Sequence, residues 1–230
     1  MKNNLNIDGL FDFSDLSPST QNHLRRVYSL LSTGIAVAIL CFILAQYFPS
    51  FSIFFIGLGV LALFADILLI CLNRRSRTGQ IVGFTSLYGY ASSVGGLFGS
   101  YLNSFEPNER MDMYRLMMSA LVSVLIIFIM FSVFALLTSN RTGIYLLVVI
   151  SSLILSILSC FMWGSASILS AIVCSLYIVT DTQNIIYRQK TTGSDAIYDA
   201  KMLFIDMVKL FSKLLEYFKK KDEEKKKKEK

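Results

Sequence analysis

The chain has 230 residues, of which 54% are hydrophobic and only 17% are charged, and its formal net charge is +6. This composition excludes a soluble globular domain, because such a domain needs polar side chains over its whole surface. The apolar residues instead form blocks that are long enough to cross a bilayer, which takes about 20 helical residues. We therefore predict an all-α membrane protein.

Seven segments of this kind follow one another along the chain. The first six are almost free of charge, and Asp66 in the second is their one internal charged residue. The seventh is apolar on one side and charged on the other. The segments span residues 27–48, 51–72, 81–102, 116–137, 145–162, 166–179 and 197–218. Because the connections are short, we predict a single transmembrane helical bundle over residues 27–218, preceded by an N-terminal segment, 1–26, and followed by a lysine-rich tail, 219–230.

The third segment is rich in small residues. Gly95 and Gly99 lie four positions apart, which places them on the same side of a helix and allows another helix backbone to approach closely. We interpret these glycines as packing residues rather than as ligand-binding residues.

Lysine and arginine residues near the segment ends indicate the orientation of the bundle in the membrane. Arg25 and Arg26 precede the first segment, and the second, fourth and sixth connections also contain arginine or lysine, whereas the third is net acidic. This pattern predicts that the N-terminus and the even-numbered connections lie in the cytosol. Asn140, in the fourth connection, is then expected to remain unglycosylated although it begins an Asn-Arg-Thr acceptor sequence.

The lysine-rich tail conflicts with this orientation. After six crossings from a cytosolic start, a seventh crossing would export the tail, although its positive charge favours the cytosol. Residues 197–218 therefore either re-enter or lie in the membrane interface, or they span the membrane against the charge bias. Their charges form one stripe of a helix, which suits an interfacial position and equally a wet cavity at the bundle centre. The stripe consists of Asp199, Asp206, Lys209, Lys213, Glu216 and Lys220.

Three carboxylates lie in apolar surroundings, where each costs about 2.5–3.5 kcal/mol at the centre of a membrane helix. Asp66 is the deepest in its segment and has no obvious partner. Asp181 follows the apolar run of the sixth segment, and it is either a hydrated helix end or one member of a pair with Asp206. Asp206 is either a solvated residue with an i,i+3 partner in Lys209 or the second member of that pair.

The paired interpretation of Asp181 and Asp206 describes a pH switch. Two carboxylates that share a desolvated site cannot both ionise easily, so they hold a proton between them. Loss of that proton would drive the two helices apart. The oxygens of such a pair also suit a hard cation such as Ca²⁺. The sequence spacing alone leaves open whether the two side chains meet.

Metal, redox and hydrolytic chemistry is not expected. The four cysteines fall inside hydrophobic segments at unrelated spacings, and the single histidine, His23, precedes the first segment without companion ligands. We therefore predict no disulfide framework, no metal or haem centre and no cofactor. We also predict that the protein is not an enzyme, because no hydrophobic segment contains a histidine, a Gly-x-Ser-x-Gly pattern or a Gly-x-Gly-Asp pattern.

Short motifs at both ends of the chain resemble the Bax inhibitor family, the transmembrane Bax-inhibitor-motif proteins. Residues 17–28, with the sequence SPSTQNHLRRVY, are similar to the stretch before the first helix of that family. The DTQ sequence at residues 181–183 resembles the family's motif at the end of its sixth helix. The LFID sequence at residues 203–206 resembles its carboxylate motif in the seventh helix, and the lysine-rich tail is similar too.

The resemblance implies a bundle in which six helices surround a more polar seventh, an endoplasmic reticulum location, a pH-dependent calcium leak and suppression of cell death. The family's paired aspartates correspond to Asp181 and Asp206, which would sense pH, gate ion passage and bind Ca²⁺ transiently. Some members set a basic residue of the second helix against these aspartates, whereas that segment offers Asp66 here. Asp66 and Lys209 are therefore the candidates for a pore or latch.

Two functions stay open at this point. The first is a proton-gated calcium leak through the bundle, and the second is a non-conducting membrane protein that restrains cell-death or stress-signalling partners. The expected partners are the lipid bilayer, calcium ions, protons and cell-death regulatory membrane proteins, but not nucleic acid. Lys227 and Lys228 resemble a C-terminal dilysine retrieval signal, and a basic tail attracted to anionic lipid is the alternative.

Overall fold

The computed structural model describes residues 17–72, 74, 76–137, 166–191 and 195–228. All regular secondary structure in this part of the chain is helical, as predicted. The elements are α2 (Pro18–Tyr47), the 3-10 turn η1 (Pro49–Phe51), α3 (Ser52–Cys71), α4 (Arg77–Asn103), α5 (Pro107–Leu137), α7 (Ala166–Thr191) and α8 (Ala196–Lys228). The predicted fifth segment, residues 145–162, and the predicted unglycosylated Asn140 lie outside the described residues.

The described helices have the length and the surface of membrane spans. Three stretches are long and apolar enough to cross a bilayer, namely Pro18–Tyr47, Pro49–Cys71 and Glu109–Met130. Large apolar side chains of α3 point outward, and Ile53 and Ile70 are 79% and 81% exposed. Such a continuous apolar surface is stable against lipid and not against water. The chain is therefore a multi-pass membrane protein.

Two helices begin before the apolar runs that predicted them, because serine residues cap their first turns. Ser17 accepts a hydrogen bond from the backbone N–H of Thr20 at 3.3 Å, and Pro18 occupies the first turn of α2. Ser76 caps α4 in the same way, 3.0 Å from the backbone nitrogen of Gly79. These caps satisfy backbone donors that a helix start leaves free. Polar residues assigned to the N-terminal segment therefore form the first turns of α2.

The close helix approach predicted at Gly95 and Gly99 is confirmed. A Cβ atom at Gly95 would overlap the backbone of Ala38 in α2, and a Cβ atom at Gly99 would also meet the α2 backbone. The same two helices end together, since the Asn103 side chain donates a hydrogen bond to the carbonyl of Ala45 at 2.8 Å. The small residues of α4 thus allow it to pack against α2 as well as against α3.

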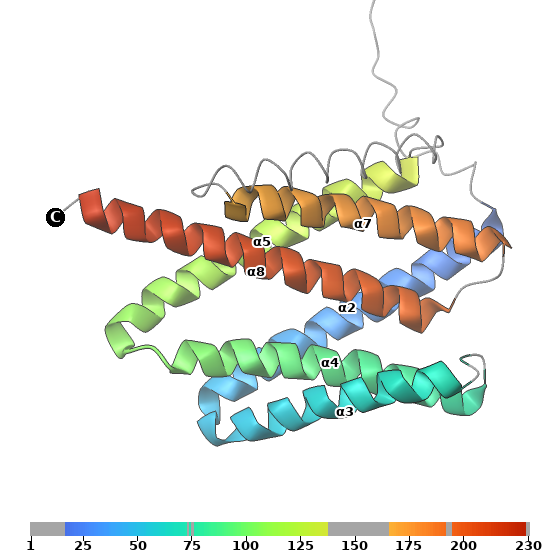
Figure 1. Ribbon diagram of the computed structural model, residues 1–230, viewed down its shortest axis with the longest axis horizontal. Coiled ribbons are helices and arrows are strands. Elements are labelled where there is room, and N and C mark those ends of the chain that lie inside the picture. The colour runs from blue at the N-terminus through green and yellow to red at the C-terminus, as the bar shows by residue number, and fades with distance from the viewer. Residues whose placement is uncertain (1–16, 73, 75, 138–165, 192–194, 229–230) are drawn as a thin grey trace, which may run out of the picture.

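The longest described helix, α8, contacts α2, α4, α5 and α7. Its side chains Leu203, Phe204, Met207 and Leu210 are buried in the main hydrophobic core. With 33 residues and a rise of about 1.5 Å per residue, it is about 50 Å long. Figure 1 shows α8 crossing the molecule from the end where α2 begins to the end where α4 and α5 meet.

The two ends of α8 lie at opposite ends of the bundle. Near its start, Asp199 contacts His23 in the first turns of α2, and near its end Lys226 pairs with Asp112 of α5 at 3.0 Å. The described part of α8 therefore extends from one end of the bundle to the other, and the position of residues 197–218 in the membrane, whether spanning, re-entrant or interfacial, stays a prediction. The helix also continues to Lys228, so the lysine-rich residues predicted as a separate tail extend α8.

Candidate functional site

The two aspartates predicted as a pair meet where α7 packs against α8. Asp206 is 4% exposed, and its Oδ1 atom accepts a hydrogen bond from Lys209 Nζ at 3.2 Å, as the i,i+3 spacing predicted. Its Oδ2 atom is buried and has no hydrogen bond of ordinary geometry to a described residue. The half-buried carboxyl group of Asp181 interacts directly with that of Asp206, and Arg188 and Asn184 of the same helix also act on it.

Apolar side chains surround this pair along both helices. Each aspartate has a neighbour one helical turn before it and another one turn after it on the same helix face. All four of these neighbours are buried. They are Ile178 and Ile185 beside Asp181, and Leu203 and Leu210 beside Asp206. Because water is excluded on these sides, repulsion between two carboxylates is weakly screened there.

A second charged cluster, formed by Asp66, Ser86 and Lys201, joins α8 to α3 and α4. The Lys201 ammonium pairs with one carboxylate oxygen of Asp66 and donates to Ser86 Oγ at 2.6 Å. Ser86 Oγ in turn donates to the other oxygen of Asp66 at 2.5 Å. The Lys201 side chain is 11% exposed and that of Asp66 is 39% exposed. The expectation that Asp66 has no partner is therefore wrong.

Lys201 is a residue that the sequence analysis missed, although the sequence contains a signal for it. It follows Asp199 in a mainly apolar part of α8 but points to another side of that helix, and a lysine inside a membrane helix requires an acidic partner. Asp66 was the deepest acid in the hydrophobic segments and lacked an evident cation. The two residues are 135 positions apart, so only the three-dimensional arrangement of α3 and α8 pairs them.

A third cluster lies at the start of α8. Asp199 is fully buried and accepts two hydrogen bonds, from Arg188 Nη2 of α7 at 2.8 Å and from His23 Nε2 of α2 at 2.9 Å. The His23 side chain is 8% exposed, and that of Arg188 is 39% exposed. His23, which the sequence analysis set aside for want of companions, thus links α2 to α8. This buried carboxylate fastens three helices at one end of the bundle.

The three clusters divide between two sides of α8. Asp199 and Asp206 are seven residues apart, which places them on nearly the same side of the helix, toward α2 and α7. Lys201 lies five residues before Asp206, about 140° around the helix, and reaches α3 and α4. Along the axis, the clusters span about 10 Å. The first half of α8 is therefore held by polar contacts on two opposing sides.

A cavity of about 340 Å³ lies between α2, α4, α5 and α8. Met207 and Val208, which follow Asp206 in the sequence, line this cavity together with Phe204 and Phe211. The lining is apolar and includes no carboxylate. Hard cations require oxygen ligands. This space therefore offers no route for Ca²⁺ in the observed arrangement of helices.

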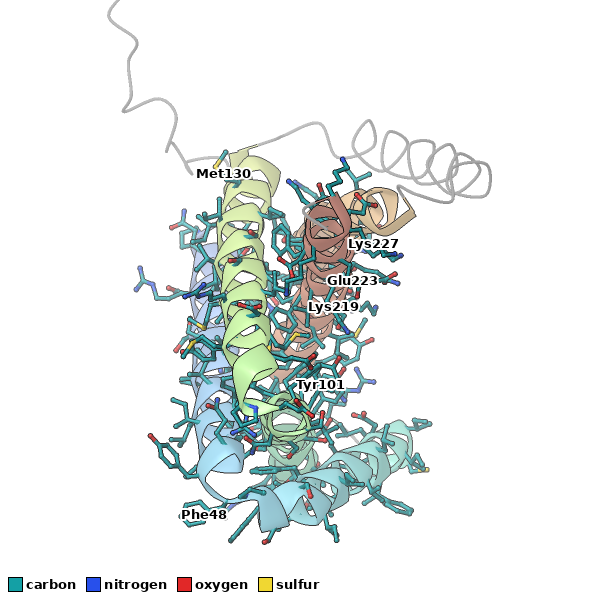
Figure 2. The ribbon with its side chains drawn as sticks, turned by 90° about the vertical axis from the view of Figure 1, so that its left-hand side faces the viewer. Phe48, Tyr101, Met130, Lys219, Glu223 and Lys227 are labelled. Atoms are coloured by element: carbon teal, nitrogen blue, oxygen red, sulfur yellow. The ribbon has the colours of Figure 1, made fainter. Side chains whose placement is uncertain are left out.

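The residues predicted as a retrieval signal, Lys227 and Lys228, lie in the last turn of α8. Figure 2 shows Lys219, Glu223 and Lys227 along this part of the helix, with Tyr101 of α4 below Lys219. The Lys219 ammonium donates to the Tyr101 hydroxyl at 3.3 Å. The lysine-rich end is thus placed against the end of α4, far from the start of α2.

Among the described residues, no group of three or more histidine, cysteine or acidic side chains is arranged to hold a metal ion. Cys41 and Cys71 are free thiols. Cys160 and the side chain of Cys174 lie outside the part of the chain that the structure describes.

Comparison with known proteins extends the resemblance over almost the whole chain. The family model described as "Inhibitor of apoptosis-promoting Bax1" matches residues 20–223. The chain is 28% identical to Bax inhibitor 1 of Bos taurus and also to that of Homo sapiens, in each case over 92% of the chain and 91% of the relative. It is 29% identical to Bax inhibitor 1 of Arabidopsis thaliana, over 90% of the chain and 85% of that protein.

Proposed function

Because the chain belongs to the Bax inhibitor family, we propose that it forms a pH-sensitive calcium leak in the endoplasmic reticulum membrane and restrains cell death. The proposal includes a bundle of six transmembrane helices around α8, an N-terminus in the cytosol, and Asp181 and Asp206 as the gating pair.

The observation that carries the proposal is the direct contact of two carboxyl groups in a water-poor interface between α7 and α8. Two negative charges that interact directly in such an interface repel strongly, and a proton on either group removes the repulsion and supplies a hydrogen-bond donor. Such a donor would satisfy Asp206 Oδ2, which otherwise has no hydrogen bond of ordinary geometry to the described residues. The protonated pair holds α7 and α8 together.

Deprotonation favours separation of the two helices. As the pH rises, the shared proton is lost, the carboxylates repel each other, and the buried interface becomes accessible to water. The same oxygens then become ligands for a hard cation such as Ca²⁺. The cavity between α2, α4, α5 and α8 is apolar, so within the described helices this rearrangement is what would bring carboxylate oxygens to a passing ion. Calcium flux therefore changes over the pH range in which the pair titrates.

Calcium flux through the purified protein in liposomes, followed with a trapped indicator over a pH series, tests this proposal. Asp181→Asn and Asp206→Asn should each remove the wild-type pH response, and the double variant should resemble the single variants, because one shared proton is lost in every case. Glu216→Gln is the matched control, since Glu216 is an exposed acid on the same helix, 44% accessible. It should leave the pH midpoint unchanged.

Two results would decide against the proposal. Single variants that keep the wild-type pH profile would exclude the pair as the gate. Absence of calcium flux from the wild-type protein at every pH would favour the non-conducting alternative, in which the protein restrains cell-death partners by binding them.

A further inference from the structure

We propose that Asp66, Ser86 and Lys201 form a positioning site that holds α8 in the rotation that sets Asp206 against Asp181. The inference rests on the proposed function, because it concerns how the gating pair is kept in contact. Lys201 and Asp206 are five residues apart in one continuous helix. A rotation or shift of α8 that moves one of these side chains therefore moves the other.

The contacts of Lys201 fix its position from two helices at once. Its ammonium is shared between the Asp66 carboxylate of α3 and the Ser86 hydroxyl of α4, and Ser86 also binds Asp66. With 11% exposure, the lysine side chain has little access to water that could replace these partners. A charge with few alternative partners strongly favours the one arrangement that satisfies it. The cluster therefore restrains α8 more than an exposed ion pair would.

The opposite side of α8 supplies the force that this restraint resists. Charge on Asp181 and Asp206 pushes α8 away from α7, while Arg188 attracts both Asp181 and Asp199. The polar groups that face these clusters come from all the described helices packed there. They are His23 and Tyr28 of α2, Asp66 of α3, Ser86 and Tyr90 of α4, Ser132 of α5, Asp181, Thr182 and Arg188 of α7, and Asp199, Lys201, Asp206 and Lys209 of α8.

Removal of the restraint should change the pH response of the pair in a defined direction. When α8 is free to turn, the two carboxylates can relieve their repulsion by moving apart. The ionised state then becomes easier to reach, so the shared proton is lost at a lower pH. Asp66, Ser86 and Lys201 thus act on the gate through position, without touching the proton or the ion.

The test uses the thermal unfolding temperature of the purified protein in detergent from about pH 5 to about pH 9, which reports the linked protonation of the pair. Asp181→Asn identifies the step that belongs to the pair, because it should abolish that step. The double variant Asp66→Asn/Lys201→Met removes both charges with little change of shape and leaves no unpaired buried ion. In this variant, the midpoint pH of the step in unfolding temperature should lie below the wild-type midpoint by about half a pH unit or more.

Lys213→Met/Glu216→Gln is the matched control, since it neutralises an exposed pair at 3.5 Å on the same helix. It should leave the midpoint at the wild-type value. The charge exchange Asp66→Lys/Lys201→Asp gives a second test of the positioning role. It can be used in place of the neutral variant if that variant does not fold. An exchanged pair that restores the wild-type midpoint supports the positioning role.

Three results would overturn the inference: a wild-type midpoint in the neutral variant, an exchange variant whose midpoint is displaced as far as that of the neutral variant, or a profile that Asp181→Asn leaves unchanged. The measurement involves no calcium. Absence of flux in liposomes would therefore refute the proposed leak and leave the positioning result standing.

Discussion

Asp199→Asn should destabilise the protein more than any exposed carboxylate substitution on α8. The wild-type side chain is fully buried and accepts charge-assisted hydrogen bonds from Arg188 and His23 at 2.8 and 2.9 Å. Such hydrogen bonds contribute about 1.5–3 kcal/mol each. The asparagine oxygen can keep one of them as a weaker neutral bond. Arg188, at 39% exposure, can recover part of its hydration.

The expected net loss is about 2–3 kcal/mol of unfolding free energy, below the 3–5 kcal/mol that a fully uncompensated buried charge costs. For a chain of this length, it corresponds to a fall of about 4–12 °C in the unfolding temperature. Thermal unfolding in detergent, followed by circular dichroism, measures this shift. We attribute this loss of stability to the burial of the Asp199 carboxylate. The same type of substitution at an exposed acid tests that attribution.

Glu216→Gln provides that comparison. Glu216 also pairs with two cations of α8, Lys213 at 3.5 Å and Lys220 at 2.9 Å, but its side chain is 44% exposed. Exposed pairs contribute about 0–1 kcal/mol, so its unfolding temperature should change by no more than about 4 °C. Equal shifts for Asp199→Asn and Glu216→Gln would refute the reasoning, because burial would then make no difference to the carboxylate.

The remaining predictions concern packing and sidedness. Gly95→Ala should lower the free energy of unfolding by about 1–3 kcal/mol, because its Cβ would overlap the backbone of Ala38. Gly57→Ala, with no atom near the added Cβ, should be neutral or stabilising in the same unfolding assay. Epitope tags at the two chain termini should be accessible to protease from opposite sides of sealed microsomes; access from the same side would contradict the course of α8. With a cytosolic N-terminus and termini on opposite sides, the lysine-rich end is luminal, so substitution of Lys227 and Lys228 with serine should leave the protein in the endoplasmic reticulum; its release would show that this end is cytosolic and would contradict the proposed orientation.

Hydrophobicity predicts the existence of the described helices but not where they begin. The apolar run at residues 81–102 lies inside α4, and the run at 166–179 forms only the first part of α7 (Ala166–Thr191). Polar residues extend these helices because caps and helix-forming side chains stabilise turns that need not be apolar. The last turns of α8 show the same effect, with Lys226 paired to Asp222 four residues earlier at 2.9 Å.

The site was predictable only where its residues are close in sequence or carry a motif. The i,i+3 contact of Asp206 with Lys209 follows from helix geometry, and Asp181 was a candidate because it follows an apolar run and lies in the DTQ motif. Asp199 and His23 are 176 residues apart, and no local pattern connects them. Their pairing depends on how α2 packs on α8, which is determined by core side chains and close backbone contacts throughout the bundle.

The uninterrupted course of α8 has a mechanical consequence. Residues 196–228 contain neither glycine nor proline, so the helix has none of the usual points at which a rod of this length bends. A tilt that begins at the aspartate pair is therefore transmitted to both ends, toward His23 at one end and toward the Lys226–Asp112 contact at the other. Movement at either end of α8 is likewise transmitted to the aspartate pair. A protein or lipid that engages the lysine-rich end could alter the proton affinity of a site in the opposite half of the molecule without touching it.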